Sequence, residues 1–285
     1  ILKKVKIPNT KIVNSKFKFR AKERTISIEE ILKDKLTQKE LKIIPKAQEV
    51  VGKILILEIP EELLKKEKVI AQAYLQVNKS IETVVRKSKE HSGVFRLRKV
   101  KILAGKKSKE TIHIENGIKL KLDLEKTYFS ARSANERLRI AKQIKKGEEV
   151  LVMFCGAAPF PLVIAKNSEA KFIEGIEINP AAYNYALENI NLNNCSKRVK
   201  VYLGDVRDIL PKVKKKYNHI VMPLPKTGEE FLDLALSKAK KGTIINFYAF
   251  LNEDEFKDYG KKILGICKDY KQKVKILEIV KCGQF

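Results

Sequence analysis

The sequence predicts an α/β protein whose largest part is a doubly wound, Rossmann-like parallel sheet. From Glu148 onward, strand-like apolar runs alternate with helix-like segments, and several runs end in a small, acidic or Pro-rich turn. Parallel strands joined by helices bring their carboxyl ends to one edge of the sheet, where ligands bind. We therefore expect about seven strands and a binding site at that edge.

The individual elements follow from this alternation. Strands are expected at residues 150–154, 171–178, 199–203, 219–222, 242–250 and 273–280, and helices at 180–192, 227–240 and 253–269. Pro180 suits the first turn of its helix, because the N–H that proline lacks would have no partner there.

Two smaller units precede the sheet. We expect a basic N-terminal domain at 1–46, an α+β middle domain at 47–126 and the sheet domain at 127–285. Apolar and basic residues alternate up to Arg20, which is typical of a strand with one cationic face. Such a strand either contacts RNA or is an edge strand whose charge prevents aggregation. Ser27 is placed to cap a helix.

The middle domain is expected to hold a mostly antiparallel sheet. Strand-like segments lie at 50–59, 81–86 and 94–103, and a helix opens at Pro60 and runs to Gln76. Asn116-Gly117 predicts a type I′ turn in a hairpin at 112–124.

Composition limits the functional classes. The chain has 285 residues, 44% hydrophobic residues and a formal net charge of +26. Its four cysteines form no C-x-x-C pair, which argues against a zinc cluster or disulfide framework. With no membrane-span pattern and no signal peptide, we expect a cytoplasmic protein. The charge favours a polyanionic partner, although a Lys-rich or heat-adapted proteome is an alternative.

Polar residues at the expected strand ends suggest a nucleotide-like ligand. The turn Cys155-Gly156-Ala157-Ala158 follows the first strand and precedes a helix, and Cys155 is interpreted as a small packing residue. Glu177 ends the second strand, where it could accept hydrogen bonds from both ribose hydroxyls. Asp205 follows the third strand, where it could accept from an adenine amino group.

The order of four short motifs resembles the class I S-adenosylmethionine-dependent methyltransferases. These motifs are FCGAAPF, IEINP, GDVRD and PLPK. Upstream, YFSARSANER at 128–137 and GVFR at 93–96 resemble the archaeal and eukaryotic tRNA guanosine-37 N1-methyltransferases. The resemblance implies S-adenosylmethionine as cofactor, the anticodon loop of tRNA as partner, a monomer, and no metal. Ala131 departs from the family motif, which has proline there.

The resemblance also implies the residues of the site. The catalytic residues would be Glu136, Arg96, Tyr128, Arg132 and Pro223. The cofactor-binding residues would be Arg137, Phe154, Cys155, Gly156, Glu177, Ile178, Asn179, Asp205, Val206, Leu224 and Pro225. Glu136 would remove the N1 proton, Tyr128 would stack on the purine, and Arg137 would bind cofactor or position Glu136.

Each of these roles has a structural alternative. Glu136 lies three residues after Ser133, as a helix capping box requires. Tyr128 could be a core residue, and Arg96 could be one surface cation among several.

Pro223 bears on the substrate. The guanosine-37 family usually has Asn-Leu-Pro-Lys after the fourth strand, and this chain has Pro223 in place of that asparagine. The change resembles an archaeal subgroup that also methylates carbon 7 of 4-demethylwyosine in tRNA-Phe. Two alternatives stay open: an aminocarboxypropyl transferase that uses the same cofactor, and a non-catalytic RNA-binding protein.

Overall fold

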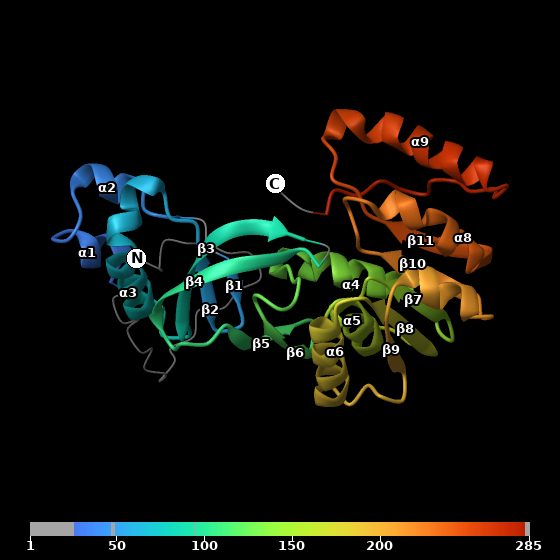
Figure 1. Ribbon diagram of the computed structural model, residues 1–285, viewed down its shortest axis with the longest axis horizontal. Coiled ribbons are helices and arrows are strands. Elements are labelled where there is room, and N and C mark those ends of the chain that lie inside the picture. The colour runs from blue at the N-terminus through green and yellow to red at the C-terminus, as the bar shows by residue number, and fades with distance from the viewer. Residues whose placement is uncertain (1–25, 47–48, 94, 283–285) are drawn as a thin grey trace, which may run out of the picture.

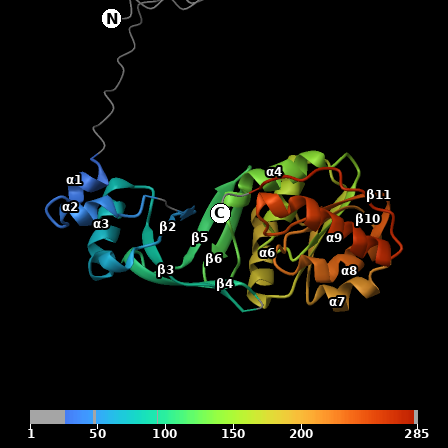
Figure 2. The same cartoon turned by 90° about the horizontal axis from the view of Figure 1, so that it is seen from above.

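The computed structural model describes residues 26–46, 49–93 and 95–282, and it is elongated. The N-terminal helices α1 to α3 lie at one end, and the helices that surround the large sheet lie at the other (Figures 1 and 2). The long β3–β4 hairpin runs from the first end toward the second.

The large sheet is parallel throughout and confirms the doubly wound class. It consists of β7 (Glu149–Met153), β8 (Phe172–Glu177), β9 (Val199–Leu203), β10 (Tyr217–Met222) and β11 (Ala239–Phe247). Their order is β11-β10-β7-β8-β9, so the strand order reverses beside β7. Within the described residues the sheet has these five strands, so the expectation of about seven is wrong. Residues 273–280 form no strand, because they pair with no neighbour in the described chain.

Helices cover both faces of this sheet. One face packs against α4 (Ala134–Gln143), α5 (Pro159–Asn167) and α6 (Pro180–Leu192), and the other against α7 (Val206–Ile209), α8 (Leu232–Ser237) and α9 (Phe256–Asp269). Side chains of β7 alternate between the two cores: Val150 and Val152 lie in the first, Leu151 and Met153 in the second. A strand buried on both faces needs such a continuous apolar run. Short 3₁₀ helices supplement these elements: η3 (Ala131–Ser133), η4 (Leu210–Lys212), η5 (Gly228–Phe231) and η6 (Glu253–Glu255).

The second sheet has the order β1-β2-β3-β4. Its strands are β1 (Glu49–Val51), β2 (Ile54–Leu57), β3 (Thr83–Ser92) and β4 (Leu97–Gly105), and all pairs are antiparallel except β2 with β3. The helix expected from Pro60 begins as η2 (Glu61–Lys66) and continues as α3 (Glu67–Val77).

Helices α1 (Ile28–Leu32) and α2 (Gln38–Lys42) pack on α3 and share its core. Leu32, Leu36 and Ile44 belong to the same buried cluster as Leu55 and Ile70. Ser27 caps α1 as expected, accepting from the N–H of Glu30 at 3.1 Å. The strand expected before Arg20 lies outside the described residues, and the domain limits at 46/47 and 126/127 stay a prediction.

The predicted hairpin consists of β5 (Glu110–Glu115) and β6 (Ile118–Asp123). Asn116 and Gly117 have φ of 44° and 80°, as a type I′ turn requires.

Asn189 of α6 and Asn193, the C-cap residue of this helix, join the free edge of β6 to the large sheet's core. Asn189 accepts from the N–H of Lys121 at 2.7 Å and donates to its carbonyl at 2.9 Å. Asn193 does the same with Lys119, at 2.8 and 2.7 Å. The amide of Asn189 also donates to the carbonyl of Ala157 at 3.1 Å.

Candidate functional site

A cavity of about 620 Å³ lies at the edge of the large sheet where the strands β7 to β10 end. Every predicted catalytic and cofactor-binding residue lines it. These are Arg96, Tyr128, Arg132, Glu136, Arg137, Phe154, Cys155, Gly156, Glu177, Ile178, Asn179, Asp205, Val206, Pro223, Leu224 and Pro225. The fold therefore gathers residues that are up to 129 positions apart (96 to 225) around one space.

The turn after β7 is tight and largely made of small residues. Phe154, Gly156 and Ala158 all have φ near +60°, which brings the chain sharply into α5. Cys155 is buried beneath β8, and a Cβ added at Gly175 would lie 2.8 Å from its Sγ. Burial raises the pKa of the Cys155 thiol well above its usual value, so it stays protonated. This arrangement supports its interpretation as a packing residue.

The carboxylate of Glu177 lies at the end of β8 and is 8% exposed. It accepts from the N–H of Gly156 at 2.7 Å and from the N–H of Asn179 at 2.8 Å. Burial raises the pKa of Glu177, and these backbone hydrogen bonds oppose the rise. The carboxylate has four lone pairs, more than these backbone donors occupy, so it can also accept from a ligand hydroxyl. The side chain of Asn179 caps α6 and also donates to the carbonyl of Lys126, so it positions the turn.

Asp205 is the N-cap of α7 and accepts from the N–H of Arg207 at 2.8 Å. The guanidinium of Arg207 lies 4.4 Å from the ring centre of Phe231, which in turn makes an edge contact with Phe154 at 5.0 Å. Phe231 is thus an apolar wall of the cavity that the sequence analysis missed.

Arg96 comes from the second sheet and reaches this cavity. It has φ of 50° in the turn between β3 and β4. Its guanidinium carbon lies 4.8 Å from the ring centre of Tyr128 and 5.7 Å from that of Phe250. Arg132 is exposed at the wall of the same cavity. Phe250 also lines the cavity, because the strand expected through residue 250 ends at Phe247.

The carboxylate of Glu136 is 7% exposed and has three hydrogen-bond donors. Arg139 donates from Nε to Oε2 at 2.7 Å and from Nη2 to Oε1 at 2.9 Å, and the hydroxyl of Tyr248 donates to Oε1 at 2.6 Å. Ser133 is at the N-cap of α4 but makes no side-chain cap bond. The capping-box alternative for Glu136 is therefore wrong.

Arg137 does not position Glu136 as expected. It makes a two-pronged ion pair with Glu115, from Nε at 2.5 Å and from Nη2 at 2.6 Å, and both side chains are almost fully buried. Nη2 also donates to the carbonyl of Ser130 at 3.0 Å. The residue that holds Glu136 is Arg139, three positions later on the same face of α4, a spacing from which the sequence could have suggested it.

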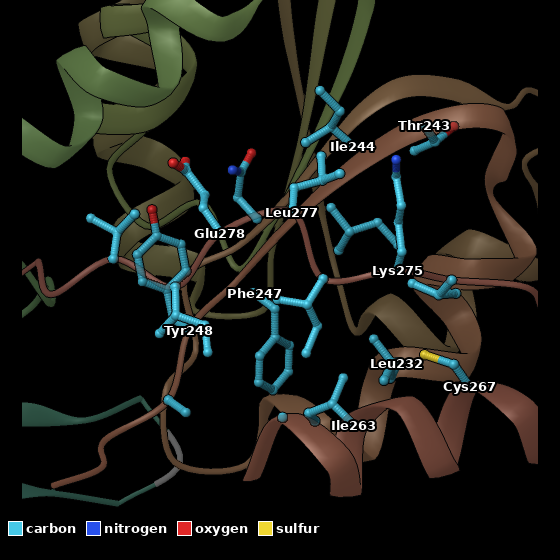
Figure 3. A pocket seen from close by; sticks show the side chains of 18 of the residues that line it. Leu232, Thr243, Ile244, Phe247, Tyr248, Ile263, Cys267, Lys275, Leu277 and Glu278 are labelled. Atoms are coloured by element: carbon cyan, nitrogen blue, oxygen red, sulfur yellow. The ribbon is translucent and has the colours of Figure 1, made fainter. Parts of the chain in front are cut away.

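A second, larger cavity of about 1760 Å³ lies between β11, α9 and residues 272–282. Figure 3 shows it lined by apolar side chains such as Phe247 and Ile263, with Tyr248 and Glu278 at one end. Glu136, Tyr248 and Cys282 line both cavities, so they form the wall between them. The converging strand ends lie at the smaller cavity, and we place the candidate site there.

In the described part of the chain, every helix is too short or too polar to span a bilayer. Among the same residues, no three His, Cys, Asp or Glu side chains gather where they could hold a metal ion.

Comparison with known proteins gives the family. The family model described as the TRM5/TYW2 methyltransferase domain matches residues 111–277, and that of the TYW2 N-terminal domain matches residues 28–108. The chain belongs to the TRM5/TYW2 methyltransferase family. The first match begins at the β5–β6 hairpin, which agrees with the hairpin's packing in the core of the large sheet.

Three curated relatives carry different activities in their names. The chain is 39% identical over 237 residues to the tRNA (guanine(37)-N(1))-methyltransferase Trm5b of Pyrococcus abyssi, covering 83% of this chain and 70% of the relative. It is 37% identical to a tRNA(Phe) (4-demethylwyosine(37)-C(7)) aminocarboxypropyltransferase of Pyrococcus horikoshii, covering 78% and 77%. It is 32% identical to the tRNA 4-demethylwyosine(37)-methyltransferase Taw21 of Saccharolobus solfataricus, covering 74% and 80%.

The crystal structure of wild-type Trm5b from Pyrococcus abyssi is similar over most of this chain. The TM-score is 0.79 at 34% identity, covering 96% of this chain and 81% of that one. Another similar structure is a complex of aTrm5 with tRNALeu, with a TM-score of 0.74 at 32% identity, covering 88% and 74%. The TRM5/TYW2 fold thus extends over both sheets of the chain.

Proposed function

We propose that this protein transfers a methyl group from S-adenosylmethionine to N1 of guanosine 37 in the anticodon loop of tRNA. The observation that carries the proposal is the buried carboxylate of Glu136, which lines the same cavity as the strand-end carboxylates of Glu177 and Asp205. The cavity then contains both a proton acceptor and the edge of the sheet that would bind the nucleoside part of the cofactor. The name of the Pyrococcus abyssi relative supports this activity.

The residues at the strand ends fit the cofactor. Glu177 would accept from the ribose hydroxyls, and Asp205 retains acceptor capacity beside the hydrophobic ring of Phe231. Gly156 leaves the turn open, because the nearest atom to a Cβ added there is the carbonyl oxygen of Tyr128 at 3.6 Å. When bound, the cofactor supplies a methyl group on a sulfonium.

The other wall of the cavity would hold the base. Guanine N1 carries a proton, so methylation requires that proton to leave as the N–C bond forms. Glu136 would accept it, and a positioned carboxylate contributes about 10²–10⁴-fold in such a step. Tyr128 would stack on the purine, and Arg96 and Arg132 would stabilise negative charge that develops on O6.

A second substrate is favoured by Pro223. We infer that the protein also methylates carbon 7 of 4-demethylwyosine in tRNA-Phe. Proline offers neither an N–H nor a polar side chain to the base, so that position leaves the base edge without the hydrogen bond that an asparagine would make. The Taw21 relative is named for 4-demethylwyosine methylation. The aminocarboxypropyl transfer named for the Pyrococcus horikoshii relative is the alternative reaction at the same atom.

Mass spectrometry of tRNA nucleosides distinguishes these reactions. Two substrates are needed, one tRNA with guanosine at position 37 and one with 4-demethylwyosine, each incubated with protein and S-adenosylmethionine. We expect a gain of one methyl group on each. If the 4-demethylwyosine tRNA gains an aminocarboxypropyl group, the second activity is the transfer of that group and not methylation. If neither tRNA changes in mass, the proposal is wrong.

A further inference from the structure

We propose that Arg139 and Tyr248 are positioning residues that clamp the carboxylate of Glu136 and leave one defined lone pair for the proton. This inference rests on the proposed role of Glu136 as general base. The sequence motifs that carry the resemblance to the family include neither Arg139 nor Tyr248.

The clamp fills three of the four lone-pair positions of the carboxylate. Oε1 accepts from Nη2 of Arg139 at 2.9 Å and from the Tyr248 hydroxyl at 2.6 Å, so both of its lone pairs are in use. Oε2 accepts from Nε of Arg139 at 2.7 Å and from no other donor in the described chain. The free lone pair of Oε2 is therefore the proton acceptor that this geometry assigns.

Arg139 approaches Glu136 from the second cavity. Arg139 lines that cavity and not the smaller one, whereas Glu136 and Tyr248 line both. With Arg139 held on the second-cavity side and a further hydrogen bond from Tyr248, the carboxylate cannot rotate freely. A base held in one orientation keeps the geometry that proton transfer requires.

Arg139 is itself anchored. Its Nη1 donates to Oε1 of Glu278 at 2.7 Å, and Gln143 donates to the same oxygen at 3.2 Å. Gln143 in turn accepts from Asn246 of β11 at 3.1 Å. Figure 3 shows the Glu278 carboxylate and the Tyr248 hydroxyl at the same end of the second cavity. Glu278 thus contributes to the orientation of Glu136 although it does not line the smaller cavity.

The electrostatics agree with this geometry. Burial and the neighbouring Glu136 raise the pKa of the Tyr248 hydroxyl, so it stays protonated and donates. The hydrogen bond with Glu136 raises the pKa of Arg139, so it remains a cation. Both donors are therefore present throughout the working range of pH.

A double-mutant cycle tests the inference. Tyr248→Phe and Arg139→Lys are each made in the natural background and in Glu136→Gln, and single-turnover methylation of guanosine-37 tRNA is measured at saturating protein. In the natural background we expect each change to slow the reaction about tenfold, because each removes a hydrogen bond to a charged group. In the Glu136→Gln background we expect less than about a twofold further loss, because a residue that acts through Glu136 has nothing left to position.

Tyr259→Phe is the matched control. The Tyr259 hydroxyl also donates to a carboxylate, that of Glu229 at 3.0 Å, and it lines the second cavity but not the smaller one. We expect its single-turnover rate to equal that of the natural protein. Cofactor affinity and thermal unfolding, measured for every variant, show that it is folded.

The outcomes separate the two proposals. If Glu136→Gln alone methylates at the natural rate, the general-base assignment fails and the clamp fails with it. If Glu136→Gln is slow but Tyr248→Phe and Arg139→Lys cost the same factor in both backgrounds, Glu136 remains the base and the clamp is refuted.

Discussion

Glu115→Gln is expected to destabilise the protein strongly while leaving the cofactor site intact. Glu115 is 8% exposed, and its carboxylate accepts two hydrogen bonds from Arg137. The Arg137 guanidinium is also buried, next to the rings of Phe129 and Phe160. The change keeps the shape of the side chain but removes the charge, so the guanidinium is left buried without its counter-ion.

The magnitude follows from this burial. Breaking a buried ion pair by removing one partner costs about 3–5 kcal/mol. At about 2–4 °C per kcal/mol, that corresponds to a fall of about 6–20 °C in the unfolding temperature. The exposed pair of Glu188 with Lys121, at 2.9 Å, provides the control, and Glu188→Gln should cost at most about 1 kcal/mol.

The pH dependence gives an independent check. Burial alone would raise the pKa of Glu115, but hydrogen bonds from His113 and Arg137 outweigh it, so the pKa lies below the ordinary value of 4.5. A carboxyl with a lowered folded-state pKa stabilises the protein above its unfolded-state pKa and loses this contribution as pH falls through the folded-state value. The difference between natural protein and Glu115→Gln should therefore be full at neutral pH and shrink below about pH 4.

Calorimetric unfolding and cofactor titration measure the two effects. We expect a large fall in stability with cofactor affinity changed less than about twofold, since Glu115 does not line the smaller cavity. Unchanged stability together with a tenfold loss of cofactor affinity would refute the assignment of Arg137 to Glu115.

Three further predictions concern the cavity and the charge. Glu177→Ala should weaken S-adenosylmethionine binding by about 1.5–3 kcal/mol by calorimetry, and unchanged affinity would contradict its role with the ribose. The pKa of Glu177 is raised above 4.5 in the folded protein, so ionising this carboxyl costs stability. As pH rises through the folded-state pKa, the free energy of unfolding should therefore fall, while cofactor affinity rises because the carboxylate is the form that accepts hydrogen bonds. The +26 charge predicts that tRNA affinity falls steeply as the salt concentration rises. Deleting residues 1–25 should weaken tRNA binding but not cofactor binding. If the shortened protein binds tRNA as tightly as the full chain, that segment is not a tRNA contact. Pro223→Asn should retain N1 methylation of guanosine and depress carbon methylation of 4-demethylwyosine, and equal loss of both would refute the dual-substrate hypothesis.

The sequence predicted the large sheet because its strands are buried on both faces and alternate with helices. Runs such as 150–153 and 220–222 are continuously apolar, and the turns after them contain Gly156 or Pro223. The site residues follow from the same regularity, since the ends of parallel strands must meet. The turn at Asn116-Gly117 could be predicted for a local reason, because these two residue types adopt positive φ more readily than others.

What could not be predicted was the choice of partners. Residues 273–280 alternate like a strand, but a strand exists only when a neighbour pairs with it. Arg137 and Arg139 are both cations near Glu136 on one helix, and only the position of Glu115 at the end of β5 decides which one turns away. Phe231, Tyr248 and Phe250 reach the cavity by tertiary packing that no local pattern encodes.

The hydrogen bonds of Asn189 and Asn193 with the backbone of β6 have a chemical consequence. One amide group, that of Asn189, joins the edge of β6, the helix α6 and the carbonyl of Ala157 in the turn after β7. Asparagine is thermolabile. Asn189 is fully buried, so water reaches it only when heat opens α6; hydrolysis of its amide would then release ammonia and leave a carboxylate facing two carbonyl oxygens that have lost their donor. The hairpin and the cofactor turn would be loosened by the same event. Ageing at high temperature would therefore damage the binding of the methyl donor from a position that contacts no ligand.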